Sequence, residues 1–141
     1  MVLLLLALAA AQPASAQCPA TDTQLPQSLG MWRHAESSTG HLTIGKAVEF
    51  TLTPSTGGTS DLQAELRFDA PKAGTYEVAL SQAAWIDVIE NGSALKSIAH
   101  RHGPPCSTIR KIVTFQLKSG PHLLRISRGQ AARVKALVIQ Q

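Results

Sequence analysis

Aromatic side chains are scarce in this chain of 141 residues, since Trp, Tyr and Phe together make up 4% of it. Proteins that bind single-stranded nucleic acid stack the bases on aromatic side chains that alternate with basic ones. The sequence shows no such alternation, so nucleic acid is the least favoured of the anionic partners. Val, Ile, Leu and Ala must supply most of the core.

Carboxylates are absent from the whole C-terminal part of the chain. All nine Asp and Glu residues lie at or before Glu90, together with four Lys and Arg, whereas residues 91–141 hold nine Lys and Arg and no acid. Such an asymmetry indicates an anionic partner, or it means that two halves of one domain neutralise each other. Any functional carboxylate must therefore lie at or before Glu90.

The motifs of several enzyme classes are also missing. The chain has no Gly-x-Ser-x-Gly nucleophile elbow, no Walker sequence and no dinucleotide-binding glycine pattern. We therefore expect a binding protein without catalytic activity. Asn91-Gly92-Ser93 matches a glycosylation sequon, which matters only in a eukaryotic secretory host.

Long apolar runs are absent except at the start, where Val2 to Ala11 is unbroken. This run is too short for a stable membrane span, and the small residues Ala14 and Ala16 fit a signal peptidase site. We expect a signal peptide at 1–16, an N-terminal arm at 17–40, a single domain at 41–141 and no transmembrane anchor. The protein would then be exported, to the periplasm or outside the cell.

Cysteine occurs only at Cys18 and Cys106. An oxidising compartment favours disulfides, and these two residues allow one intramolecular bridge, which would pin the arm to the body. A metal ligand or a reactive thiol is the alternative interpretation.

Alternating apolar residues predict short β-strands throughout the rest of the chain. Asn91-Gly92 between two such runs is a strong hairpin signal, because a type I′ turn needs positive φ at both positions. We predict an all-β fold, an antiparallel β-sandwich of about eight strands whose topology could be a jelly roll. The expected strands are 42–52, 64–69, 75–81, 84–90, 93–99, 109–117, 122–128 and 133–139.

His100 and His102 are the candidate metal ligands. Residues two apart on a strand point to the same face, so both imidazoles could hold one divalent transition metal. The remaining ligands would come from Cys106, His34, His41 or His122. Two solvated loop histidines without a metal are the alternative.

Asp87 lies in the apolar strand sequence Trp85-Ile86-Asp87-Val88-Ile89. An unpaired buried charge is expensive, so we predict a structural ion pair. The expected partners are Arg101, Arg110 and Lys111.

The C-terminal bases are the strongest functional indication. Four of these bases lie opposite the clearest apolar faces, namely Arg110, Arg125, Arg133 and Lys135. They would form one cationic sheet face if their strands are neighbours. Trp85 or Trp32 could stack on a sugar. Such a face would bind an anionic glycan, an envelope component or a protein partner. Neutralisation by acids of the first half is the alternative.

One segment, 68–117, is similar to a known group of proteins. The matching sequences are Ala73-Gly74-Thr75-Tyr76, Ala84-Trp85-Ile86-Asp87-Val88, His102-Gly103-Pro104-Pro105-Cys106 and Ile109-Arg110-Lys111. It resembles short exported proteobacterial proteins of no established activity, some of which carry a homogentisate 1,2-dioxygenase label. This chain has neither the length nor the two-His, one-Glu iron motif of that enzyme.

The Gly-Thr-Tyr turn and the following hairpin are also similar to carbohydrate-binding β-sandwich modules, over about half of the chain. The sequence thus favours an exported, non-catalytic β-sandwich that binds an anionic ligand. A metal protein or oxygenase-like enzyme using His100 and His102 is the second hypothesis, and a purely structural envelope domain is the third.

Overall fold

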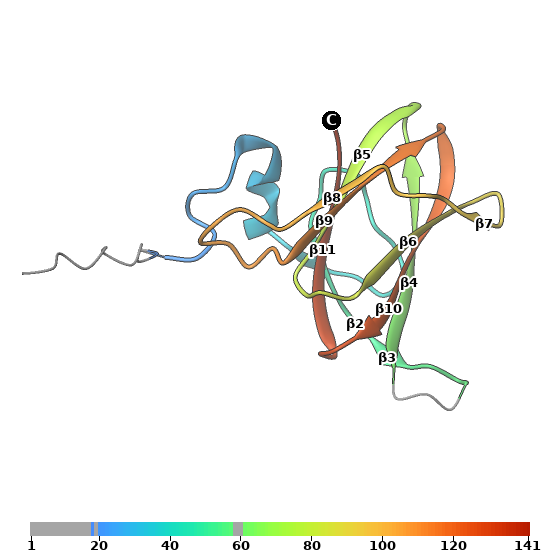
Figure 1. Ribbon diagram of the computed structural model, residues 1–141, viewed down its shortest axis with the longest axis horizontal. Helices are drawn as coiled ribbons and strands as arrows, with labels where there is room; N and C mark the ends of the chain where they lie inside the picture. Colours follow the sequence, from blue (N-terminus) through green and yellow to red (C-terminus); the bar gives the residue numbers. More distant parts are fainter. Residues whose placement is uncertain (1–17, 19, 58–60) are drawn as a thin grey trace, which may run out of the picture.

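The computed structural model describes residues 18, 20–57 and 61–141, so the predicted signal peptide lies outside the described residues. Strands dominate this part of the chain (Figure 1). The elements are η1 (Gln27–Arg33), β1 (Glu36–Ser37), β2 (Val48–Thr51), β3 (Thr53–Pro54), β4 (Leu62–Ala70), β5 (Gly74–Leu80), β6 (Trp85–Glu90), β7 (Ser93–Ala94), β8 (Ala99–Arg101), β9 (Lys111–Leu117), β10 (Gly120–Gly129) and β11 (Arg133–Gln140).

The strands form two sheets that face each other as a sandwich. Sheet A has the order β1-β2-β11-β5-β9-β8 and sheet B the order β3-β4-β10-β6-β7. Apart from the parallel β1–β2 pair, the named strands pair antiparallel. The predicted all-β sandwich is confirmed.

The topology is that of a jelly roll. When β2, β4, β5, β6, β7, β9, β10 and β11 are counted as strands 1 to 8, sheet A reads 1-8-3-6 and sheet B reads 2-7-4-5. The long strands therefore alternate between the sheets along the chain, and residues distant in sequence become neighbours.

The main core lies between the two sheets and is built by period-two alternation. In β10 the buried Leu124 and Ile126 point inward, and in β11 Val134, Ala136 and Val138 do the same. The intervening side chains of these strands therefore lie on the outer faces of the sandwich.

The outer face of sheet A carries a second, smaller core. Leu29 and Trp32 of η1 are buried there against Leu137, Ile139 and Ile112. Residues three apart fall on one side of a 3₁₀-helix, so Leu29 and Trp32 face the sheet together. The arm thus covers sheet A, as the blue segment beside the sandwich in Figure 1 shows.

The predicted hairpin is present, and it turns through Asn91 with φ 50° and Gly92 with φ 79°. Two predicted strands were wrong in extent. Within the predicted strand 42–52, the structure forms only β2, which begins at Val48. The strand begins late because the chain turns at Gly45, which has φ 83°.

The predicted strand 93–99 is in fact two short strands on different sheets. β7 pairs with β6 in sheet B, whereas β8 pairs with β9 in sheet A. Both are exposed, with only Leu95 partly buried between them. The segment crosses from one sheet to the other because it has no continuous apolar face that would hold it to one of them.

Candidate functional site

The four bases predicted to share one face do not meet. Arg125 lies on β10 in sheet B, whereas Arg133 and Lys135 lie on β11 in sheet A. Arg110 precedes β9, which is separated from β11 by β5. Because the bases on β10 and β11 alternate with inward apolar residues, they point away from opposite sides of the sandwich.

Acids of the first half pair with two of these four bases. Arg125 Nε lies 2.9 Å from Glu65 Oε1, and Arg133 Nη2 lies 3.0 Å from Glu49 Oε2. Lys135 Nζ donates to the Trp32 carbonyl at 3.2 Å and lies 5.2 Å from the Trp32 ring centroid. The four bases therefore do not form the predicted cationic face, and cross-strand pairing places acids beside Arg125 and Arg133.

The two tryptophans differ in availability. Trp32 is fully buried and its Nε1 donates to Thr108 Oγ1 at 2.9 Å, so it cannot stack on a ligand. Trp85 at the start of β6 remains 51% exposed. Exposure of half a tryptophan is costly in water, which makes Trp85 a candidate contact residue.

Two cations flank Trp85, and we call Trp85, Lys111 and Arg128 the Trp85 platform. Lys111 Nζ lies 5.2 Å and Arg128 Cζ lies 5.5 Å from the ring centroid, both within cation–π range. The half-exposed ring thus lies beside two positive charges.

Local structure sets each member of the platform in place. Arg128 has φ 54° in an irregularity of the β10 ladder between Ile126 and Gly129, and such bulges re-aim side chains. Lys111 begins β9 and its Nζ donates to the Ala84 carbonyl at 3.0 Å. Each cation is thus directed to the ring by a feature outside the regular strand pairing.

Asp87 contributes charge to the platform without forming a close ion pair. Burial lowers the pKa of Lys111, and the nearby Asp87 carboxylate opposes this effect. Of the other expected partners, Arg101 pairs with the buried Glu77 at 2.6 Å. Among the described residues Asp87 has no ion pair within 4.0 Å.

A hollow of about 1020 Å³ crosses the outer face of sheet B. It reaches from the segment 38–41, which joins the free edge of β4 through His41 and Arg67, to the β6–β7 turn. It is lined by Ser38, Thr39, Gly40, His41, Glu65, Arg67, Phe68, Asp69, Ile89, Gly92, Pro121, His122 and Leu123.

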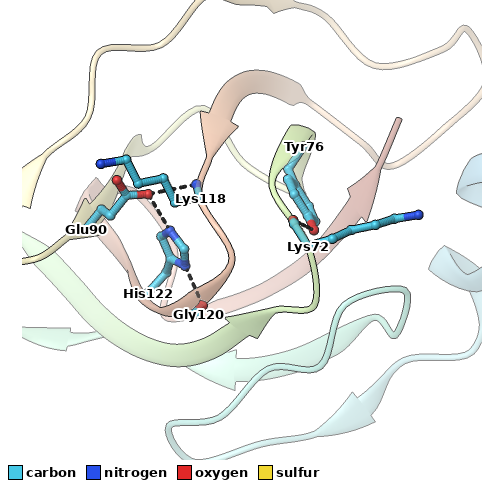
Figure 2. A network of polar contacts seen from close by, with 6 residues as sticks. All are labelled: Lys72, Tyr76, Glu90, Lys118, Gly120 and His122. Atoms are coloured by element: carbon cyan, nitrogen blue, oxygen red, sulfur yellow. Dashed lines mark hydrogen bonds and ion pairs between the residues drawn. The ribbon is translucent and has the colours of Figure 1, made fainter.

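A buried polar network supports one wall of the hollow (Figure 2). His122 Nε2 lies 2.7 Å from Glu90 Oε2, and its Nδ1 lies 2.8 Å from the Gly120 carbonyl. Each ring nitrogen thus lies within hydrogen-bond distance of an oxygen. The ring also stacks on Phe68, with centroids 5.4 Å apart.

The same network fixes the charge of Glu90. The Lys118 backbone N–H donates to Glu90 Oε2 at 3.0 Å, and this bond, with that from His122, holds the pKa of Glu90 below its usual value. On the other side of the view in Figure 2, the Tyr76 hydroxyl donates to the Lys72 carbonyl at 2.6 Å. These contacts fix the turns at one end of the sandwich.

The structure gives the predicted histidine pair no further ligand. His100 and His102 are both exposed, Cys106 is bonded to Cys18, and both nitrogens of His122 already have partners. Within the described ranges, no group of three or more His, Cys, Asp or Glu side chains could hold a metal ion.

The predicted disulfide is present between Cys18 and Cys106. Asp22 reinforces it, because its Oδ1 and Oδ2 accept from the Thr108 backbone N–H at 2.7 Å and hydroxyl at 2.6 Å. The arm is thus attached by a covalent bond and a polar clasp.

In the part of the chain that the structure describes, no helix has the length and apolarity of a membrane span.

Sequence reasoning chose Trp85 but missed Arg128 and the hollow. Lys111 was considered only as a partner of Asp87. Arg128 shares the parity of the inward residues Leu124 and Ile126, and only the bulge turns it toward Trp85. A short-range signal for that bulge is present in Gly129, next to Arg128, because glycine within a strand often marks a bulge.

The fold and its outer face define a β-sandwich of jelly-roll topology with an open, chemically mixed sheet B. No protein-family model matches the chain, and no curated protein is similar to it. Among solved structures it is similar to the pre-peptidase C-terminal domain of collagenase from Bacillus anthracis, with 10% identity, a TM-score of 0.47, and coverage of 74% of this chain and 95% of that one.

A second similar structure is a beta-glucosidase from Paenibacillus barengoltzii. It has 12% identity and a TM-score of 0.33, and the match covers 89% of this chain and 14% of that one. Both likenesses are too distant to carry an argument.

Proposed function

We propose that this protein is an exported, non-catalytic binding domain that recognises an acidic glycan through the Trp85 platform. The main observation that supports this proposal is the half-exposed Trp85 ring, with Lys111 and Arg128 within 5.5 Å of its centroid. An aromatic ring offers a surface for the apolar face of a sugar, and the two cations attract its carboxylate or sulfate.

Export is part of the proposal. A disulfide that pins the N-terminal arm is typical of proteins in oxidising compartments, and the bridge between Cys18 and Cys106 supports this location. The ligand would then be a component of the cell envelope or of the surroundings.

A first prediction tests the platform by calorimetry. The probes are a glucuronate-containing disaccharide and its carboxyl-reduced, neutral form. We expect Trp85→Ala to weaken binding of the acidic disaccharide by about tenfold, a loss of the size that stacking of a nucleobase on an aromatic ring contributes, roughly 1–3 kcal/mol. Lys111→Ala combined with Arg128→Ala should remove the preference for the acidic form.

The control is Arg33→Ala, which removes one positive charge from η1 on the opposite outer face. It should leave the affinity unchanged. Binding to the acidic probe should weaken as salt rises, because exposed charges are screened. An affinity independent of salt, or unaffected by Trp85→Ala, would overturn the proposed function.

A further inference from the structure

The outer face of sheet B continues from the Trp85 platform into the hollow. On β6 the outward residues are Ile89, Asp87 and Trp85, because Ile86 and Val88 belong to the core. Ile89 in the hollow lies four positions along β6 from Trp85, a span of about 13 Å at the strand rise. The platform and the hollow therefore lie along one strand and on one face.

The ladder registers arrange this face as three rows. The first row is Arg67, Leu123 and Ile89, the second is Glu65, Arg125 and Asp87, and the third ends with Ser127 and Trp85. Each row crosses the strands, so a ligand lying along β6 passes all three in turn.

Charge differs from row to row. Lys111 and Arg128 make the Trp85 end cationic. The middle row is net acidic, because Arg125 pairs with Glu65 and leaves Asp87 without a close partner among the described residues. An acidic sugar unit fits the Trp85 end, and the same unit over the middle row would be repelled by Asp87.

The hollow matches hydroxyl groups better than ions. Arg67 and Asp69 are two residues apart on β4, so they share its outer face, and neither forms an ion pair within the described ranges. A guanidinium only donates and a carboxylate only accepts, whereas each sugar hydroxyl does both. A polyanion would meet Asp69 and Glu65, and a polycation would meet Arg67.

Apolar side chains complete the match. Ile89, Leu123 and Pro121 line the hollow beside these polar groups. They offer an aliphatic surface to the C–H face of a sugar ring, and such mixed linings are typical of small-molecule sites.

We infer that the hollow and the Trp85 platform form one track for a linear saccharide that carries one acidic unit at its end, followed by neutral units. The acidic unit lies at Trp85 and the neutral units lie over the middle row and in the hollow beside Arg67 and Asp69. This inference rests on the proposed function and specifies the class of glycan.

Calorimetry with four probes tests the track. They are a disaccharide of glucuronate and one neutral hexose, a tetrasaccharide with a single terminal glucuronate followed by three neutral hexoses, tetragalacturonate with a carboxylate on every unit, and the uncharged, carboxyl-reduced form of the tetrasaccharide. We expect the tetrasaccharide with one glucuronate to bind about tenfold more tightly than the disaccharide, as one further hydrogen bond to a charged group implies. Tetragalacturonate and the carboxyl-reduced tetrasaccharide should bind more weakly than the tetrasaccharide with one glucuronate.

Arg67→Ala should abolish the gain from chain length and leave the disaccharide affinity unchanged, whereas Arg33→Ala should change neither. No gain with length, equal binding of tetragalacturonate, or no effect of Arg67→Ala would overturn the track while leaving the Trp85 platform intact. If Trp85→Ala does not weaken the disaccharide, or if no acidic probe binds, the proposed function itself fails. Circular dichroism of each variant confirms that the fold is retained.

Discussion

Single residues decide how the turns of this sandwich are held. Glu90 ends β6 and accepts from the Lys118 backbone N–H and from His122, which joins the β6–β7 hairpin to the β9–β10 turn. Because both donors favour the charged carboxylate, the pKa of Glu90 falls below its ordinary value of 4.5. One acidic side chain thus couples two turns that are distant in sequence.

The pH dependence of stability follows from the direction of this shift. A carboxyl group whose folded-state pKa is lowered stabilises the fold above its unfolded-state pKa, and this contribution is lost as the pH falls through the folded-state value. Glu90→Gln should therefore be less stable than the wild type at neutral pH, and the difference should shrink below about pH 4.5.

Urea denaturation from about pH 7 to about pH 3 measures this difference. Glu36→Gln is the matched control, since Glu36 is exposed on β1 and should show no such convergence. A Glu90→Gln deficit that stays constant over the whole range would contradict the assignment.

Glycine is required at one loop position for steric reasons. A Cβ built on Gly103 would lie 1.9 Å from the Ile109 carbonyl oxygen and 2.6 Å from its carbonyl carbon, both backbone atoms. Gly103→Ala must therefore displace the segment before β9, at a cost of about 1–3 kcal/mol. Thermal denaturation of Gly103→Ala beside Gly30→Ala, where no atom lies within 4 Å, measures the effect. Equal melting temperatures for the two variants would refute it.

At the scale of elements, the arm is part of the fold and not an appendage. Its η1 buries Leu29 and Trp32 on sheet A, and β1 pairs with β2 at the edge of that sheet. Unpaired edges and exposed apolar faces promote aggregation, so the arm protects sheet A in both respects. The disulfide and the clasp between Asp22 and Thr108 hold the arm there.

Removal of the disulfide should destabilise the protein strongly. Cys18 and Cys106 are 88 residues apart, and closing a loop of that size contributes about 4 kcal/mol in the chain-entropy model. Urea denaturation of Cys18→Ser combined with Cys106→Ser should show a loss of this order. Thiol titration of the unfolded, non-reduced wild type should find no free cysteine. Two free thiols, or a double variant of wild-type stability, would contradict the bridge.

At the scale of the whole molecule, the two outer faces have different chemistry. Sheet A is covered by the arm. On this side Arg133 pairs with Glu49, and Lys135 donates to the Trp32 carbonyl. Sheet B is open and carries the hollow and Trp85. The net charge of +4 therefore does not indicate where a ligand binds.

This asymmetry gives a prediction for two arginines of equal charge. Arg133→Ala, on the covered side, should leave binding of the acidic disaccharide unchanged, whereas Arg128→Ala should reduce it about fivefold to tenfold, as loss of a charge-assisted contact implies. Calorimetry of the two variants under identical salt makes the comparison. A loss with Arg133→Ala equal to that with Arg128→Ala would mean that net charge, and not the platform, controls binding.

The sequence by itself determined the class of fold, the Asn91-Gly92 hairpin and the pairing of the two cysteines. These follow from local rules, because side chains alternate with a period of two, a type I′ turn needs those residues, and two cysteines allow one intramolecular bridge. Most of the long strands fell where the alternation predicted them. Residues 93–99 do not form the predicted strand, because all of their side chains except Leu95 are exposed and they have no continuous apolar face.

Only the tertiary structure decided which residues lie beside the bases of the C-terminal part. Alternation fixes which side of a strand a residue occupies, but not which strand lies beside it, and the pairing of Arg125 with Glu65 and of Arg133 with Glu49 joins residues 60 and 84 positions apart. The jelly-roll order thus neutralised two of the predicted bases. It also brought Lys111 and Arg128 to Trp85 from two different sheets, which no short-range pattern encodes.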